Sequence, residues 1–146
     1  MRRVVFDASV LVAGLRRRRG ASFVLLRAVR ERVIVPLATP SLFLEYEDVL
    51  HRPEQIEATK LTAMDIDAVL GALASAIEPV EVHILWRPQL RDAGDELVLE
   101  AAVNGRADAL VTHNVADFAE AAPRFGPPLL CPGEMLGQDA IRRLVP

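Results

Sequence analysis

The sequence predicts an α/β fold in which a mostly parallel sheet lies between two layers of helices. Short apolar runs, which are typical of buried strands, alternate along the chain with segments whose apolar residues recur at helical spacing. The chain has 146 residues, 51% of them hydrophobic, so it is long enough to build one domain with a substantial core. We therefore expect a single domain that spans residues 1–146.

Five elements are expected in the first part of the chain. They are strands at 4–6 and 33–35 and helices at 9–14, 21–30 and 40–50. The strands are short apolar runs, and the helix at 21–30 places its apolar residues on one face. Gly14 is expected to close the first helix, and Pro36 to end the second strand. Thr39 followed by Pro40 favours a helix start, because Thr caps helices and proline fits their first turn; this helix should stop before Pro53.

The alternation continues to the end of the chain. We expect a helix from Thr62 to about Ile77, a strand at 80–82, a helix at 95–103, strands at 109–112 and 129–130, and a last helix from about Pro132. Thr62 and Asp65 resemble a capping box, in which Asp replaces the usual Glu or Gln. Pro79 should break the helix before it, and Gly105 lies just beyond the end of the helix at 95–103.

The charge is distributed unevenly. Residues 1–60 carry 11 Arg and Lys against 7 Asp and Glu, whereas residues 61–146 carry 6 against 13, and the net charge is −3. The run Arg16, Arg17, Arg18 and Arg19 contributes to the basic share and is expected in a loop. These guanidinium groups could hold a phosphate backbone, or they could form a solvated loop; the sequence favours neither interpretation.

Four acidic residues occupy unusual positions. Asp7 and Asp117 follow apolar strands, Asp95 opens a predicted helix, and Glu45 lies on the apolar face of another. Ligands of open α/β sheets bind beyond the carboxyl ends of the strands, where these side chains could meet. Carboxylates that are partly removed from water repel one another, and a hard cation such as Mg²⁺ or Mn²⁺ would neutralise them. Each acid also has an ordinary structural interpretation as a turn residue, helix cap or solvated side chain, so the hypothesis depends on all four together.

Four stretches carry a resemblance to a known family. They are Val4–Val12, Thr39–Leu50, Arg91–Asp95 with the helix that follows it, and Ala107–Phe118. In their order and spacing the chain resembles the PIN-domain ribonucleases, and in particular the toxins of bacterial and archaeal toxin–antitoxin pairs. The resemblance implies a Rossmann-like α/β/α sandwich and an endoribonuclease that uses Mg²⁺ or Mn²⁺ to cut RNA. It also implies a small antitoxin as partner and a homodimer.

The resemblance also implies roles for individual residues. Asp7, Glu45 and Asp95 match the first three acids of the family, and Ser9 matches the small polar residue that supports the first. The fourth position is open. Asn114 stands where many relatives have an acid, and the acid found three residues later in other relatives corresponds to Asp117. A divalent ion held there would activate a water molecule and neutralise charge on the phosphate.

The sequence argues against two alternatives to a ribonuclease and leaves a third open. A phosphoacceptor receiver domain needs a lysine at a late strand end, but the only lysine, Lys60, precedes a helix. A haloacid-type phosphatase needs a second Asp two residues after the first, where this chain has Ser9. The third alternative, a catalytically weak or inactive PIN-fold module that binds RNA or protein, remains open because Asn114 carries no charge.

The remaining features favour a cytoplasmic protein. Apolar runs stay well below the roughly 20 residues of a membrane span, and the N-terminus has no pattern of a signal peptide. The single cysteine, Cys131, cannot form an internal disulfide and is typical of a reducing compartment. We therefore expect no membrane partner.

Overall fold

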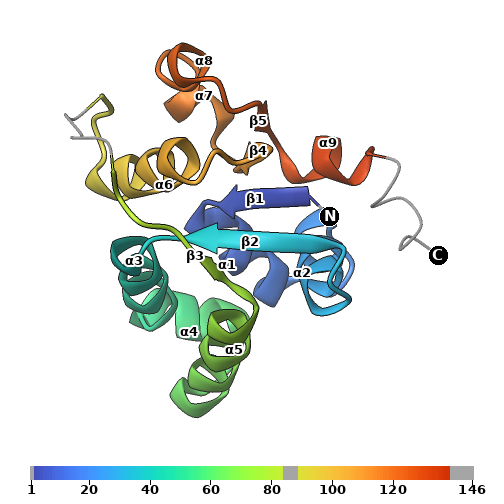
Figure 1. Ribbon diagram of the computed structural model, residues 1–146. Coiled ribbons are helices and arrows are strands. Elements are labelled where there is room, and N and C mark those ends of the chain that lie inside the picture. The colour runs from blue at the N-terminus through green and yellow to red at the C-terminus, as the bar shows by residue number, and fades with distance from the viewer. Residues whose placement is uncertain (1, 84–88, 139–146) are drawn as a thin grey trace.

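The computed structural model describes residues 2–83 and 89–138, which form an α/β structure around one parallel sheet (Figure 1). The sheet has the strand order β3-β2-β1-β4-β5, and all its pairings are parallel. Its strands are β1 Arg2–Phe6, β2 Ile34–Ala38, β3 Glu78–Pro79, β4 Ala109–Val111 and β5 Leu129–Leu130. The predicted fold class is thus confirmed. Residue 1 and residues 84–88 and 139–146 of the expected domain lie outside the described residues.

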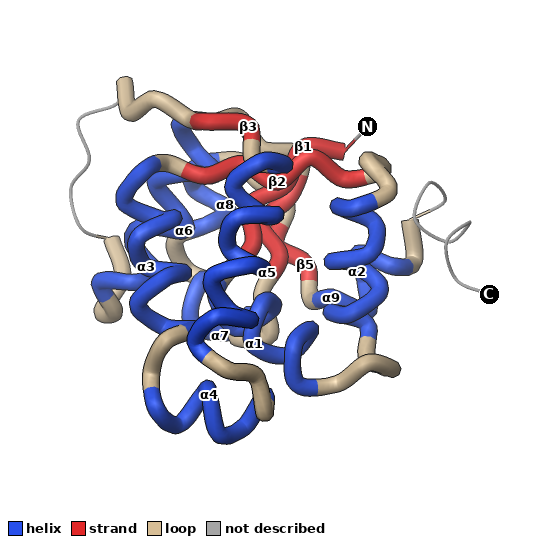
Figure 2. Tube along the Cα trace, turned by 90° about the horizontal axis from the view of Figure 1, so that it is seen from below, coloured by secondary structure: helices blue, strands red, loops and turns tan. Residues whose placement is uncertain are grey.

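Helices cover both faces of this sheet (Figure 2). They are α1 Ala8–Arg16, α2 Ala21–Arg30, α3 Pro40–Leu50, α4 Pro53–Thr59, α5 Ala63–Ala76, α6 Ala93–Asn104, α7 Val115–Phe118, α8 Ala122–Phe125 and α9 Pro132–Leu136. On one face α3, α5 and α6 pack against Val5 and Leu110, and on the other α2 and α9 pack against Val4 and Phe6. Successive residues of β1 therefore serve opposite cores, as the period of a strand requires. Among the described residues, no helix combines the length and the apolar character that crossing a membrane requires.

Two predicted helix starts are confirmed by their capping hydrogen bonds. The Thr39 hydroxyl accepts a hydrogen bond from the Leu42 N–H at 3.1 Å. Thr62 and Asp65 form a reciprocal capping box, with the Asp65 N–H donating to the Thr62 hydroxyl at 3.1 Å and the Thr62 N–H donating to the Asp65 carboxylate at 3.0 Å. These bonds satisfy backbone donors that the first turn of a helix leaves without partners.

Other expected boundaries were wrong. Gly14 does not close α1, which continues to Arg16, so that Arg16 belongs to a helix and not to a loop. A Cβ atom at Gly14 would lie 2.5 Å from a methyl group of Leu26, so glycine serves here to let α1 and α2 pack closely. Pro36 lies inside β2, because β3 pairs with β2 only at Leu37 and Ala38 and the missing N–H is tolerated before that point.

The other differences lie in short elements. The strand expected at 80–82 occurs slightly earlier in the chain, as β3 at Glu78–Pro79. Pro53, expected beyond a helix, instead begins α4, since proline suits a first helical turn. The helix expected from Asp95 begins two residues earlier, at Ala93. The short helices α7 and α8 were not predicted.

Candidate functional site

Asp7 is the first residue beyond β1, at the carboxyl edge of the sheet. The parallel register pairs Phe6 with Val111, and the Asp7 N–H extends this ladder by donating to the Val111 carbonyl at 2.9 Å. The Asp7 side chain is only 7% exposed. Its Oδ2 atom accepts hydrogen bonds from the hydroxyls of Ser9 at 2.8 Å and Thr112 at 2.7 Å. The carboxylate is therefore buried, oriented and supported by two neutral donors.

Helix α3 brings Glu45 beside Asp7. The buried Tyr46 hydroxyl donates to the Phe6 carbonyl at 2.5 Å, which ties α3 to the end of β1. Burial, with a smaller contribution from the negative charge of Asp7, raises the pKa of this phenol, so Tyr46 is a neutral anchor. The neighbouring Glu45 is half-buried and reaches the cavity described below.

The start of α6 contributes two carboxylates. Asp92 caps the helix, because its Oδ1 atom accepts the Asp95 N–H at 3.1 Å. Gly94 lies between them. A Cβ atom at this position would lie 2.8 Å from Oε1 of Glu45 and 3.0 Å from Oδ1 of Asp92, so any larger residue would displace these carboxylates. Glycine therefore allows α6 to approach the carboxylate of α3 closely.

Asp95 is the most perturbed carboxyl group of the site. Partial burial raises its pKa from 3.8 to about 7, and the charges of Asp7, Asp92 and Asp117 act in the same direction. The shift therefore reflects loss of water first and repulsion by neighbouring negative charges second. Such shifts are common where groups are gathered for function.

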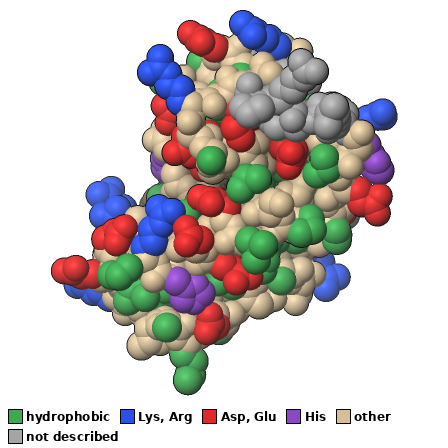
Figure 3. All heavy atoms as spheres, turned by 90° about the vertical axis from the view of Figure 1, so that its left-hand side faces the viewer, with side chains coloured by type: hydrophobic (Ala, Val, Ile, Leu, Met, Phe, Trp, Pro, Cys, Tyr) green, Lys and Arg blue, Asp and Glu red, His purple; other side chains and the backbone are tan. Residues whose placement is uncertain are grey.

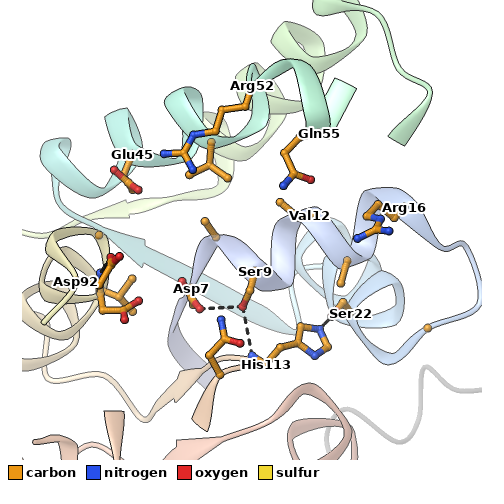
Figure 4. Close-up of a pocket in the computed structure, with 18 of the residues that line it drawn as sticks. Asp7, Ser9, Val12, Arg16, Ser22, Glu45, Arg52, Gln55, Asp92 and His113 are labelled. Carbon is orange, nitrogen blue, oxygen red and sulfur yellow. Dashed lines mark hydrogen bonds between the residues drawn. The ribbon is translucent and has the colours of Figure 1, made fainter. Parts of the chain in front are cut away.

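These side chains line one cavity of about 750 Å³, which is within the usual range of ligand pockets (Figure 4). The predicted residues that line it are Asp7, Ser9, Arg16, Arg17, Glu45, Asp95 and Asn114. Arg18 and Arg19 do not line it. Acidic side chains are spread over the face of the molecule shown in Figure 3, with Lys and Arg mainly toward its margins.

Asp117 lies outside this cavity. It is exposed and lines an adjoining cavity of about 760 Å³, which shares Asp92, Asp95 and Asn114 with the first. The Asp117 N–H donates to the Asn114 carbonyl at 3.0 Å, so the chain does turn back after β4. Asn114 lines both cavities. Asp117 lines only the adjoining cavity, and from there its negative charge helps to raise the pKa of Asp95.

The donor atoms suit a hard divalent cation. Carboxylate oxygens from Asp7, Glu45, Asp92 and Asp95 and the amide of Asn114 face the same space, without cysteine. Among the described residues, no three Asp, Glu, His or Cys side chains are arranged to hold one ion directly. Mg²⁺ commonly retains several waters and uses only one or two carboxylates, so the residues fit such an ion.

Several further residues line the cavity, and Asp92, Arg52 and Gln55 among them were not predicted. Asp92 had a local signal, since it stands three residues before Asp95 in a helix-start pattern. Arg52 and Gln55 had no such signal, because they lie at the start of α4, a helix that the sequence did not predict. His113 is exposed, but its Nε2 atom lies 2.7 Å from the hydroxyl of the buried Ser22 at the start of α2.

The comparisons with known proteins are consistent with this geometry. A family model described as the PIN domain matches residues 3–116, which include Asp7, Glu45, Asp95 and Asn114. The matched segment covers most of the chain and ends just before Asp117. No curated protein and no solved structure matches the chain.

We predict that Gly94→Ala will weaken the binding of Mg²⁺ or Mn²⁺ with little loss of stability. The added methyl group would displace the flexible carboxylates of Glu45 and Asp92, while alanine is the better helix former by up to about 1 kcal/mol. Calorimetric titration measures the ion affinity, and thermal melts measure stability. Gly71→Ala in α5 is the matched control, because a Cβ atom there meets nothing within 4 Å. Equal ion affinity in the two variants would contradict the prediction.

We also predict that the metal-free protein loses stability as the pH rises from 5 to 8. Asp95 has a pKa of about 7 in the folded protein against 3.8 ordinarily, so the folded state binds more protons within this window. The free energy of unfolding must then fall as pH rises and level off above the folded pKa. Urea unfolding of wild type and Asp95→Asn at several pH values tests this, and the variant should show the weaker dependence. Parallel profiles would exclude Asp95 as the source.

Proposed function

This chain belongs to the PIN-domain family, and we propose that it is a divalent-metal-dependent endoribonuclease that hydrolyses RNA phosphodiester bonds. PIN domains are generally nucleases and typically use divalent metals. The observation that carries the proposal is the convergence of Asp7, Glu45 and Asp95, from three separate elements, on one cavity at the carboxyl edge of the sheet. The raised pKa of Asp95 supports it, since a cation would relieve the repulsion that contributes to this shift.

Asp7, Glu45 and Asp95 would hold the ion partly through its water ligands, with Asn114 or Asp117 as the further oxygen donor. When bound, such an ion supplies activation of a water molecule and neutralisation of the charge that develops on the phosphate. Ser9 and Thr112 both donate hydrogen bonds to Oδ2 of Asp7, which fixes the orientation of this carboxylate in the proposed metal site. In the reaction a water oxygen forms a bond to phosphorus, the bond from phosphorus to the leaving ribose oxygen breaks, and a proton ends on that oxygen.

A second candidate is a PIN-fold module that binds RNA or protein without cutting it. Two observations favour this alternative. Asn114 supplies a neutral oxygen beside the carboxylates, and the described carboxylates do not form a ready-made cage for one ion. RNA binding without metal-dependent cleavage would select this function over the first.

We further propose that the nuclease acts as a toxin, forms a homodimer and is held inactive by a small antitoxin. The support is the resemblance in the four stretches named above. Expression should arrest bacterial growth, Asp95→Asn should abolish the arrest, and co-expression of a short neighbouring gene should relieve it. Growth that is unaffected by the wild-type protein would contradict the toxin role without affecting the nuclease proposal.

RNA cleavage should require a divalent ion. We expect EDTA to abolish cleavage and excess Mg²⁺ or Mn²⁺ to restore it, because the ion would activate the attacking water and the carboxylates alone would repel the phosphate. A gel assay with a labelled RNA measures this, and Asp95→Asn serves as the control for contaminating nucleases. Undiminished cleavage in EDTA by wild type but not by Asp95→Asn would overturn the metal dependence.

The fourth oxygen donor can be identified by metal titration. We expect Asp117→Asn to raise the Mg²⁺ concentration for half-maximal cleavage more than Asn114→Ala does, because of these two residues only Asp117 contributes a negative charge near Asp95. Glu120→Gln is the matched control: it removes a charge from the same adjoining cavity, but Glu120 does not contribute to the pKa shift of Asp95. If Asn114→Ala is the more damaging change, Asn114 is the site residue and Asp117 belongs to the scaffold.

A further inference from the structure

The cavity that holds the carboxylates is also lined by basic residues. Arg16 and Arg17 line it from the end of α1, and Arg52 and Gln55 line it from the junction of α3 with α4. In Figure 4, Gln55 points toward α1, and Arg16 lies beyond Gln55 on the side away from Glu45. The guanidinium group of Arg52 instead extends toward Glu45, which is close enough to act on it electrostatically. One cavity therefore has one arginine beside a carboxylate and another away from it.

The basic groups are available to a ligand. Arg16 and Arg17 are exposed and form no ion pair with any described residue. Arg52 pairs with Asp48 at 2.9 Å, but both side chains are exposed, and such pairs contribute at most about 1 kcal/mol. A guanidinium group has five N–H donors, so Arg52 can contact an anion while it keeps this pair.

Gln55 adds an independent observation. Its Oε1 atom is buried without a hydrogen-bond partner among the described residues. A buried amide oxygen without a donor is unfavourable by about 1–3 kcal/mol. A ribose phosphate combines anionic oxygens, which suit the guanidinium groups, with hydroxyl donors. Its hydroxyls would reach this buried oxygen once the Gln55 side chain turns into the cavity that it lines.

The opposite side of the carboxylates lacks this character. The adjoining cavity is lined by Asp92, Asp95, Asp117 and Glu120, with Arg91 as the cation among its described lining residues. A phosphate group would be repelled there unless ions intervene. The two sides of the carboxylates are therefore electrostatically unequal.

We propose that Arg16, Arg17 and Arg52, together with Gln55, form a subsite for the ribose-phosphate backbone of RNA on one side of the scissile bond. This inference rests on the proposed function, because it takes the carboxylates of the cavity as the place of cleavage. The subsite explains why only the first half of the arginine run faces the cavity: Arg18 and Arg19 lie outside it.

Two matched comparisons test the subsite. Arg16→Ser with Arg17→Ser is compared with Arg18→Ser with Arg19→Ser, since both doubles remove the same charge from the same run. Arg52→Ser is compared with Arg91→Ser, since each removes one arginine, Arg52 from the cavity of the proposed subsite and Arg91 from the adjoining cavity. Binding of a fluorescent RNA oligonucleotide is measured in EDTA over a range of KCl concentrations, and thermal melts confirm that each variant is folded.

We expect the slope of log Kd against log salt to fall by about 1–2 units in the Arg16 and Arg17 double and by about 0.7 in Arg52→Ser, as single-stranded contacts imply. Arg18, Arg19 and Arg91 variants should keep a slope close to wild type. Gln55→Ala should weaken binding without changing the slope, because its amide is neutral. Equal effects in the members of either comparison would overturn the subsite.

The binding assay also separates this inference from the proposed function. Because it is performed in EDTA, it does not require cleavage. If the expected differences occur but the protein never cuts RNA, the subsite stands and the nuclease proposal fails. If the protein cuts RNA with metal but the paired variants bind alike, the nuclease proposal stands and the subsite is wrong.

Discussion

Electrostatic repulsion among carboxylates at the carboxyl edge of the sheet is the constraint on which the site depends. Asp7, Glu45, Asp92 and Asp95 reach one cavity from separate parts of the chain, and their neighbours' charges contribute to the raised pKa of Asp95. Like charges in a partly dehydrated space oppose folding unless protons or a cation neutralise them. The rest of the fold must therefore hold these groups together against their own repulsion. A bound divalent ion would neutralise the charges and remove this repulsion.

The scaffold meets this requirement with buried, neutral contacts. Parallel pairing of β1 with β4 brings Asp7 beside Thr112, and the hydroxyls of Thr112 and Ser9 fix one carboxylate oxygen. The Tyr46 hydroxyl binds the Phe6 carbonyl and so fixes α3 against β1. None of these donors carries a charge, so the negative potential of the site is preserved for a cation. The same cavity is also lined by the guanidinium groups of Arg16, Arg17 and Arg52, of which Arg52 is directed toward Glu45.

The sequence predicts the fold class and several carboxylates of the site because both depend on local patterns. Asp7 directly follows an apolar strand, and helical periodicity turns Glu45 inward. The positions of Arg52 and Gln55 depend on tertiary structure. Both residues reach the cavity from the start of α4, which begins at Pro53, where the sequence predicted only the end of a helix. Sequence spacing places Asp117 near the end of β4 but does not show which cavity it lines. Whether it completes the site remains a prediction.

The proposed site requires these carboxylates to act together on one divalent ion. Mn²⁺ binding can be measured through the electron paramagnetic resonance signal of the free ion, which decreases as the ion binds. We expect one class of binding site in wild type that is greatly weakened by Asp7→Asn and by Asp95→Asn, while Glu120→Gln binds nearly as wild type does. Equal Mn²⁺ affinity in wild type and the two Asn variants, with all proteins folded, would contradict it.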